Sequence, residues 1–150
     1  MRGTGGPSRS GVTAGPAEGG GFFPLILAWA AGLITLFISE YLQVTYFYEN
    51  VATPERLESF GGRLLCVDLP NAVCIALATW VAGRMHREPF RESMPQHLAA
   101  LFAVPLFAQI VNIVMHWGHA STEGLLMSCV VAVVGAVAGY GVDRLQEGDR

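Results

Sequence analysis

The chain has 150 residues, of which 52% are apolar and only 14% are charged. A soluble domain of this size carries about 25% charged residues, so the composition excludes an ordinary water-soluble helical bundle. The formal net charge is −3, and no basic cluster is interleaved with aromatic residues. Nothing therefore indicates a nucleic-acid-binding surface, and we expect no nucleic-acid partner.

Residues 1–21 differ from the rest of the chain, because they hold eight glycines and two prolines and have no apolar periodicity. Such a segment buries too little surface to offset its ordering entropy, so we expect a disordered tail. The apolar run that follows continues well past its one A-x-A sequence, at Ala28–Ala30. This favours an uncleaved first helix over a signal peptide.

Long windows without charge dominate the remaining sequence. Residues 22–39, 98–115 and 124–142 contain no charged side chain and no histidine, and residues 64–83 contain only Asp68. Each window approaches the ~20 residues that a helix needs to cross a membrane. We therefore predict an all-α membrane protein, a four-transmembrane-helix antiparallel bundle over 22–143, followed by a cytoplasmic C-tail over 144–150. The predicted spans are 22–42, 62–84, 98–117 and 123–142.

The first connection is long and begins with an aromatic cluster of the kind found at membrane interfaces. Thr53 and Pro54 then form a typical helix start, and Gly61 a typical stop, which predicts a short surface helix. The third connection offers Ser121 or Thr122 as the cap of the last helix. The aromatic cluster consists of Tyr41, Tyr46, Phe47 and Tyr48.

Arginine supplies all nine basic residues, and its distribution predicts the orientation. With both termini on the inner side, the tails and the second connection place seven arginines inside, and the first connection places two outside. The positive-inside rule therefore predicts that both termini are cytoplasmic, in the inner (plasma) membrane of a bacterium.

Polar residues interrupt the second and third spans. Asp68 and Asn71 are three residues apart and are expected on one face of the second span. Gln109, Asn112 and His116 follow a helical spacing on the third span and overlap them in depth. An intramembrane carboxylate needs a protein partner, so we predict a polar patch of these five residues. Its role is either structural, as interhelical hydrogen bonds, or the handling of a proton or cation.

Further residues border this predicted patch. Glu40, at the outer end of the first span, is expected to contribute to the patch from its outer side. Pro70 and Pro105 are predicted helix kinks, each removing one backbone hydrogen bond beside the patch. A third alternative for the patch is a site for a lipid headgroup or a partner subunit.

Metal and haem sites have little support in the sequence. His116 and His119 are three apart and are weak candidates for a metal ion. His86 and His97 match in depth, as a haem would require, but both adjoin the charged second connection. Cys66, Cys74 and Cys129 fit small packing residues in the helices, and we predict no cofactor.

Gly135 and Gly139 form a small-xxx-small pattern on the last span, with Ala132 and Ala136 offset beside it. This pattern lets two helix backbones approach closely, although it does not name the neighbouring helix.

No nucleophile elbow, zinc-protease motif, P-loop or dinucleotide fingerprint is present, so we do not expect an enzyme. The sequence favours a small non-catalytic accessory or structural component that packs as a homo-oligomer or within a larger membrane complex. Its partners would be the lipid bilayer and either itself or another membrane protein. The alternative is a small oligomeric proton- or cation-coupled transporter or channel that uses Asp68.

Overall fold

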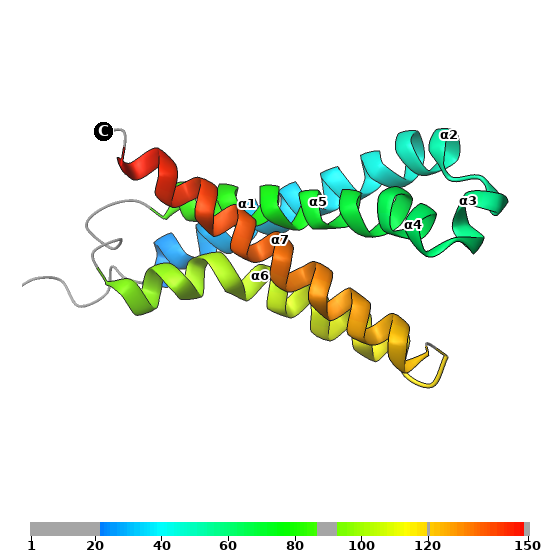
Figure 1. Cartoon of the computed structure of the whole chain (residues 1–150). Coiled ribbons are helices and arrows are strands. Elements are labelled where there is room, and N and C mark those ends of the chain that lie inside the picture. Colours follow the sequence, from blue (N-terminus) through cyan, green and yellow to red (C-terminus); the bar gives the residue numbers. More distant parts are fainter. Residues whose placement is uncertain (1–21, 87–92, 120, 149–150) are drawn as a thin grey trace, which may run out of the picture.

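The computed structural model describes residues 22–86, 93–119 and 121–148, which form helices and the turns between them (Figure 1). Four helical segments are long and apolar enough to cross a membrane. No strand occurs within the described ranges, and the prediction of a four-helix all-α membrane protein is confirmed. The predicted disordered tail, 1–21, lies outside the described residues. The four segments are Phe22–Val51, Phe60–Met85, Met94–Met115 and Thr122–Gln146.

The first span is longer than predicted. Helix α1 (Phe22–Leu42) continues without a break through a π-helical stretch, η1 (Gln43–Tyr48), into α2 (Glu49–Val51). The chain then becomes extended at Ala52 and Thr53, before Pro54. Because a residue preceding proline is disfavoured in the α conformation, this proline helps to set the end of the helix.

Two short helices follow at the membrane-interface connection. Thr53 accepts a hydrogen bond from the Arg56 amide and caps α3 (Pro54–Glu58), as predicted. The predicted stop at Gly61 is wrong. The break lies at Ser59, whose hydroxyl caps α4 (Phe60–Arg63) by accepting from the Gly62 amide at 3.0 Å. Glu55 lies in the first turn of α3. Its carboxylate accepts hydrogen bonds from its own backbone amide and from the Thr53 side chain, and these bonds lower the pKa of the Glu55 carboxyl group.

The second span is built from α4, a π-helical stretch η2 (Leu64–Asp68) and α5 (Leu69–Met85). The Leu69 amide donates to the carbonyl of Leu64, five residues back, which widens the helix by one residue at this turn. Pro70 follows directly, in the first turn of α5, where its missing N–H is best tolerated. The helix is therefore locally π-helical at the site where a proline kink was predicted.

The third span begins four residues before its predicted start and ends two residues before its predicted end, and the fourth extends beyond both predicted limits. Helix α6 (Met94–Met115) begins early because Pro95 occupies its first turn, and it runs without a break through Pro105. Helix α7 (Thr122–Gly148) starts after Ser121, whose hydroxyl accepts from the Gly124 amide at 3.1 Å. It continues from Val142 to Gly148, through the described part of the predicted C-tail, 144–148.

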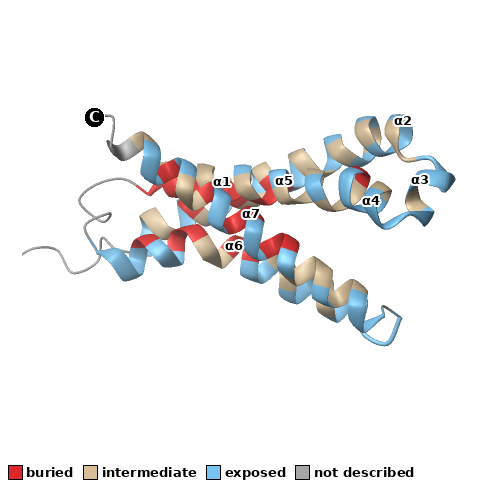
Figure 2. Ribbon diagram, in the orientation of Figure 1, coloured by how far each residue is buried: buried red, intermediate tan, exposed pale blue. Residues whose placement is uncertain are grey.

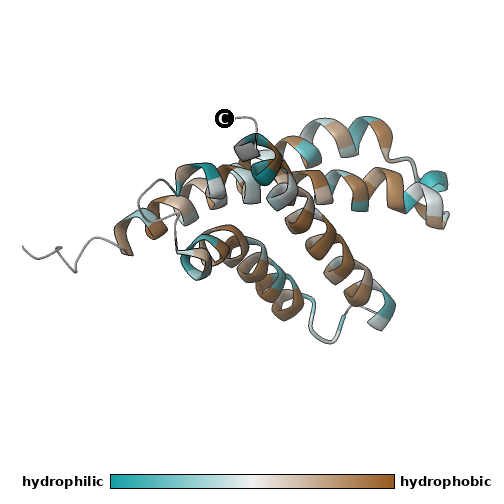
Figure 3. Cartoon of the chain, turned by 60° about the vertical axis from the view of Figure 1, so that its left-hand side comes forward, coloured by the Kyte–Doolittle hydropathy of each residue, from teal (hydrophilic) through white to brown (hydrophobic). Residues whose placement is uncertain are grey.

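The helices form two arms, one of α1 and α5 and one of α6 and α7 (Figure 1). The arms cross near the end that holds the start of α1 and the end of α7, which we call the termini end. They separate towards the opposite, hairpin end. Buried residues gather at the crossing, and the outer parts of both arms are more exposed (Figure 2). Brown, apolar residues cover the long helices on the outside, as expected of surfaces that face lipid (Figure 3).

Small residues allow the close approach of helices at the crossing. A Cβ atom on Gly32 of α1 would lie 3.2 Å from both Ala82 Cβ of α5 and Val104 Cγ2 of α6. Apolar side chains gain no hydrophobic energy by leaving lipid for protein, so contact between helices depends on close packing. The further buried small residues at these contacts include Ala28, Ala78, Ala100, Ala132 and Ala136.

Candidate functional site

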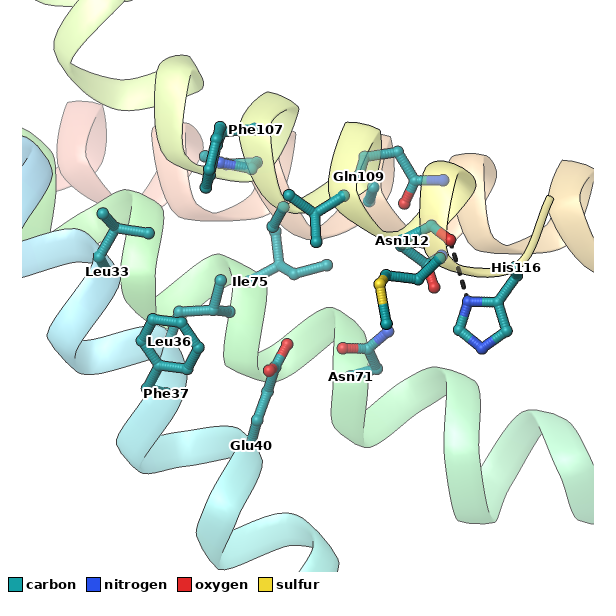
Figure 4. Close-up of a pocket in the computed structure, with 15 residues that line it drawn as sticks. Leu33, Leu36, Phe37, Glu40, Asn71, Ile75, Phe107, Gln109, Asn112 and His116 are labelled. Atoms are coloured by element: carbon teal, nitrogen blue, oxygen red, sulfur yellow. Dashed lines mark hydrogen bonds between the residues drawn. The ribbon is translucent and has the colours of Figure 1, made fainter.

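Four of the five residues of the predicted polar patch lie around one cleft between the two arms. Asn71 comes from α5, and Gln109 and Asn112 come from α6, with His116 at the end of α6 (Figure 4). The cleft has a volume of about 370 Å³. Glu40 of α1 also lines it, as the sequence had indicated. The remaining lining is mostly apolar, including Leu33, Leu36, Phe37, Ile75 and Phe107.

The polar side chains of this cleft differ in whether they form hydrogen bonds within the protein. Gln109 donates to Ser128 Oγ at 2.9 Å and to Cys129 Sγ at 3.3 Å, so its amide joins α6 to α7. Nδ1 of His116 lies 2.9 Å from the Asn112 carbonyl oxygen within the same helix end. The side chains of Asn71 and Asn112 form no hydrogen bond with another described residue. Their amide groups remain available to an occupant of the cleft.

Asp68 does not join this group, which corrects the prediction that it faces the stripe on α6. It lines a separate cavity of about 280 Å³ with Arg63 of α4 and Ser121 and Glu123 at the start of α7. Asp68 lines its cavity with the start of α7, and Asn71 lines the cleft with α6. The two residues therefore contribute to different cavities and do not form one patch.

The small residues of the last span are already occupied inside the chain. A Cβ on Gly135 would lie 2.6 Å from the Ala72 carbonyl oxygen, and one on Gly139 would lie 2.5 Å from the Ala76 carbonyl oxygen. Both positions therefore pack α7 against α5 of the same chain. Gly135 and Gly139 give no surface for a second molecule.

The two weak metal candidates point to backbone groups. His116 contacts the Asn112 carbonyl as described above, and Nδ1 of His119 lies 3.3 Å from the Trp117 carbonyl oxygen. Over the part of the chain that the structure describes, no group of three or more His, Cys, Asp or Glu side chains is arranged to hold a metal ion.

A buried polar cluster at the termini end was missed by sequence reasoning. His97 in the first turn of α6 and Asp143 of α7 are 3% and 0% exposed, with Nε2 and Oδ2 3.3 Å apart. The ring of His86, the residue after α5, is fully buried and stacks on that of His97 at 6.0 Å. The depth match of His86 and His97 was a usable signal. The predicted last span ends at Val142, one residue before Asp143, although Asp143 follows Gly139 at the spacing of one helical turn.

An apolar groove lies on the other side of α6, between that helix and α7. Its volume is about 440 Å³. The small residues Ala132 and Ala136 line it, while the exposed side chains of Leu106, Val133 and Val137 border it. The groove therefore combines small buried residues with a lipid-exposed rim. Gln109 also lines this groove.

No protein-family model, curated protein or solved structure matches the chain.

Proposed function

We propose that this small membrane protein is a non-catalytic component that packs with a second copy of itself or with another protein in the membrane. The observation that supports this most strongly is the apolar groove between α6 and α7. In lipid, helices associate by close fit rather than by hydrophobicity, and small residues permit that fit. The groove presents Ala132 and Ala136 at helical spacing beside an exposed rim, which suits a helix from a partner.

The groove lies beside Gly135 and Gly139, the pair of small residues that the sequence offered as a packing surface. The pattern at Gly135 and Gly139 is one of the sequence features that favour an oligomer, but α5 of the same chain occupies both positions. Ala132 and Ala136, on the neighbouring stripe of α7, line the floor of the groove, where they are 7% and 4% exposed. The proposal therefore moves the partner surface by one stripe around the same helix.

Two valines of α7 provide a matched test. Val137 lines the groove and Val134 lines neither the groove nor the cleft, yet each side chain is 55% exposed. Val137→Trp fills the groove and should abolish co-purification of the partner, or convert an oligomer to a monomer, in mild detergent. Val134→Trp should leave the assembly intact. If the unsubstituted chain is monomeric in mild detergent and no other protein co-purifies with it, the proposal is contradicted.

The orientation belongs to the same proposal. We place both termini in the cytoplasm of a bacterium on the strength of the arginine distribution, because seven arginines then lie inside and two outside. A reporter that fluoresces only in the cytoplasm, fused after Arg150, should be bright. A phosphatase that is active only outside the cytoplasm should be inactive at the same position, and the reverse pattern would overturn this orientation.

Transport has less support than assembly. The transport hypothesis placed Asp68 opposite Asn112 and His116, whereas Asp68 lines a cavity with residues of α4 and α7. The proposal therefore does not extend to transport. A proton or cation flux in vesicles that Asp68→Asn abolishes, with insertion unchanged, would restore the hypothesis.

A further inference from the structure

The cleft between the arms carries a single carboxylate among mostly apolar walls. Glu40 is half-buried and is the one acidic side chain among the described residues that line the cleft. Tyr41 follows it directly, and Trp117, which is 74% exposed, follows His116 on the opposite wall. Aromatic residues of this kind gather at the membrane interface. The carboxylate therefore lies near the boundary between headgroups and acyl chains, where an ionised group calls for a cationic partner.

Hydrogen-bond donors line the same cleft from two other helices. The side-chain amides of Asn71 on α5 and Asn112 on α6 are half-buried, and neither bonds another described residue. Figure 4 shows them on the walls that face Glu40 across the cleft. An amide NH₂ donates readily to a phosphate oxygen, while its carbonyl accepts from an ammonium group. The cleft thus presents an acceptor for a cation and donors for an anion.

The apolar part of the cleft continues onto the lipid-facing surface. Phe37 on α1 and Phe107 on α6 line it and are 67% and 57% exposed, so its walls reach the surrounding lipid. Leu36 and Ile75 also line it and are buried, at 3% and 7% exposed. The volume of about 370 Å³ falls in the range of small-molecule pockets. An occupant with a polar end and a hydrocarbon body matches this lining.

We propose that the cleft binds a phospholipid whose headgroup carries a primary ammonium. Glu40 would accept hydrogen bonds from the ammonium, Asn71 and Asn112 would donate to the phosphate, and the apolar walls would contact the upper acyl chains. A trimethylammonium headgroup has no N–H to donate and is larger, so the cleft should discriminate against it. The groove that carries the proposed function lies on the other side of α6 and shares Pro105, Gln109 and Ala132 with the cleft, whereas Glu40 lines only the cleft and Val137 only the groove.

The first test needs no substitution. The full chain is reconstituted in bilayers that contain equal amounts of phosphatidylethanolamine and phosphatidylcholine with matched acyl chains, and the lipids retained after detergent extraction are counted by native mass spectrometry. Phosphatidylethanolamine should be enriched by about tenfold, the ratio that one hydrogen bond to an ionised group provides. Stepwise N-methylation of the headgroup should reduce retention in steps. Equal retention of both lipids overturns the proposal.

A pair of carboxylate substitutions tests the role of Glu40. Glu40→Gln keeps the shape and removes the charge, so the enrichment should fall to near unity. Asp68→Asn changes a carboxylate in the separate cavity with α4 and α7, and the enrichment should persist. Loss of enrichment in both variants would overturn the assignment to Glu40. Circular dichroism of each variant identifies a misfolded sample, in which case the methylation series on the unmodified chain decides.

Two further outcomes separate a lipid from other occupants. Water-soluble phosphoethanolamine should not displace the retained lipid at equal concentration, and displacement would overturn the assignment to a lipid. A protein that co-purifies in place of the lipid and is lost in Glu40→Gln would also overturn it, in favour of a basic side chain of a partner. Val137→Trp should leave lipid enrichment unchanged, so failure of the proposed function and failure of this inference give different results.

Discussion

Nε2 of His97 lies 3.3 Å from Oδ2 of Asp143, and both side chains are buried at the termini end of the molecule. The contact joins the first turn of α6 to the last turns of α7, and the stacked ring of His86 adds the end of α5. Gly83 of α5 makes room for it, because a Cβ there would lie 3.2 Å from Asp143 Cγ. Three helices are therefore fastened together at the end where the arms cross.

Removal of Asp143 should destabilise the fold strongly. Loss of one member of a buried pair leaves the other in a site built for its partner, at a cost of about 3 kcal/mol. Asp143→Ala should therefore lower the free energy of unfolding by that amount in a detergent unfolding assay. Leu145→Ala, at a side chain that is 74% exposed, should change it by less than about 0.5 kcal/mol.

A double substitution checks that the two side chains act as a pair. If they do, the cost of His97→Ala with Asp143→Ala is smaller than the sum of the single costs, since each single variant already loses the shared contact. Fully additive costs would contradict an energetic coupling between the two residues.

The glycines of α7 should affect folding rather than assembly. A Cβ on Gly139 would lie 2.5 Å from the Ala76 carbonyl oxygen and 2.8 Å from Thr79 Cβ, so Gly139→Ala pushes α7 away from α5. We expect a loss of about 1–3 kcal/mol in unfolding free energy, as for an overpacked core. Gly141→Ala is the control, because a Cβ there meets nothing within 4 Å and alanine favours a helix by up to about 1 kcal/mol.

Destabilisation by both alanine variants, or a change of oligomeric state in Gly139→Ala without destabilisation, would contradict this assignment of Gly139 to the intramolecular contact.

The sequence predicted the spans well because their signal is local. A window of about 20 residues without charge predicts a membrane-spanning helix whichever helix packs against it. Thr53 and Pro54 predict a helix start because a threonine side chain can cap the first turn and proline is tolerated there. The cavity that Asp68 lines depends on where α4 and the start of α7 lie in space, which no periodicity rule predicts. The partner of Gly139 depends on which helix crosses α7. Asp143 was misread because its charge ended an apolar window, although the helix continues and three helices bury it.

Gln109 and Asn112 should differ in their effect on stability, although both are half-buried amides of α6 that line the cleft. Gln109→Leu removes the hydrogen bonds to Ser128 and Cys129 and should reduce the unfolding free energy by about 0.6 kcal/mol, the average for such bonds in membranes. Asn112→Leu, measured in the same lipid-free detergent, should have no such effect. Equal losses in both variants would contradict a specific role of Gln109 between α6 and α7.

The end of α7 belongs to the fold, and a pair of truncations tests this. Nε1 of Trp80 on α5 donates to Oε1 of Gln146 at 3.1 Å, three residues beyond the buried Asp143. A chain that stops after Val142 loses the Trp80–Gln146 hydrogen bond and the His97–Asp143 contact. It should unfold at a markedly lower concentration of denaturing detergent, or at a lower temperature, than the parent. A chain that stops after Gly148 keeps both and should match the parent. If the shorter chain is equally stable, the last turns of α7 are a solvated tail, and the polar cluster of His86, His97 and Asp143 contributes nothing to holding the arms together.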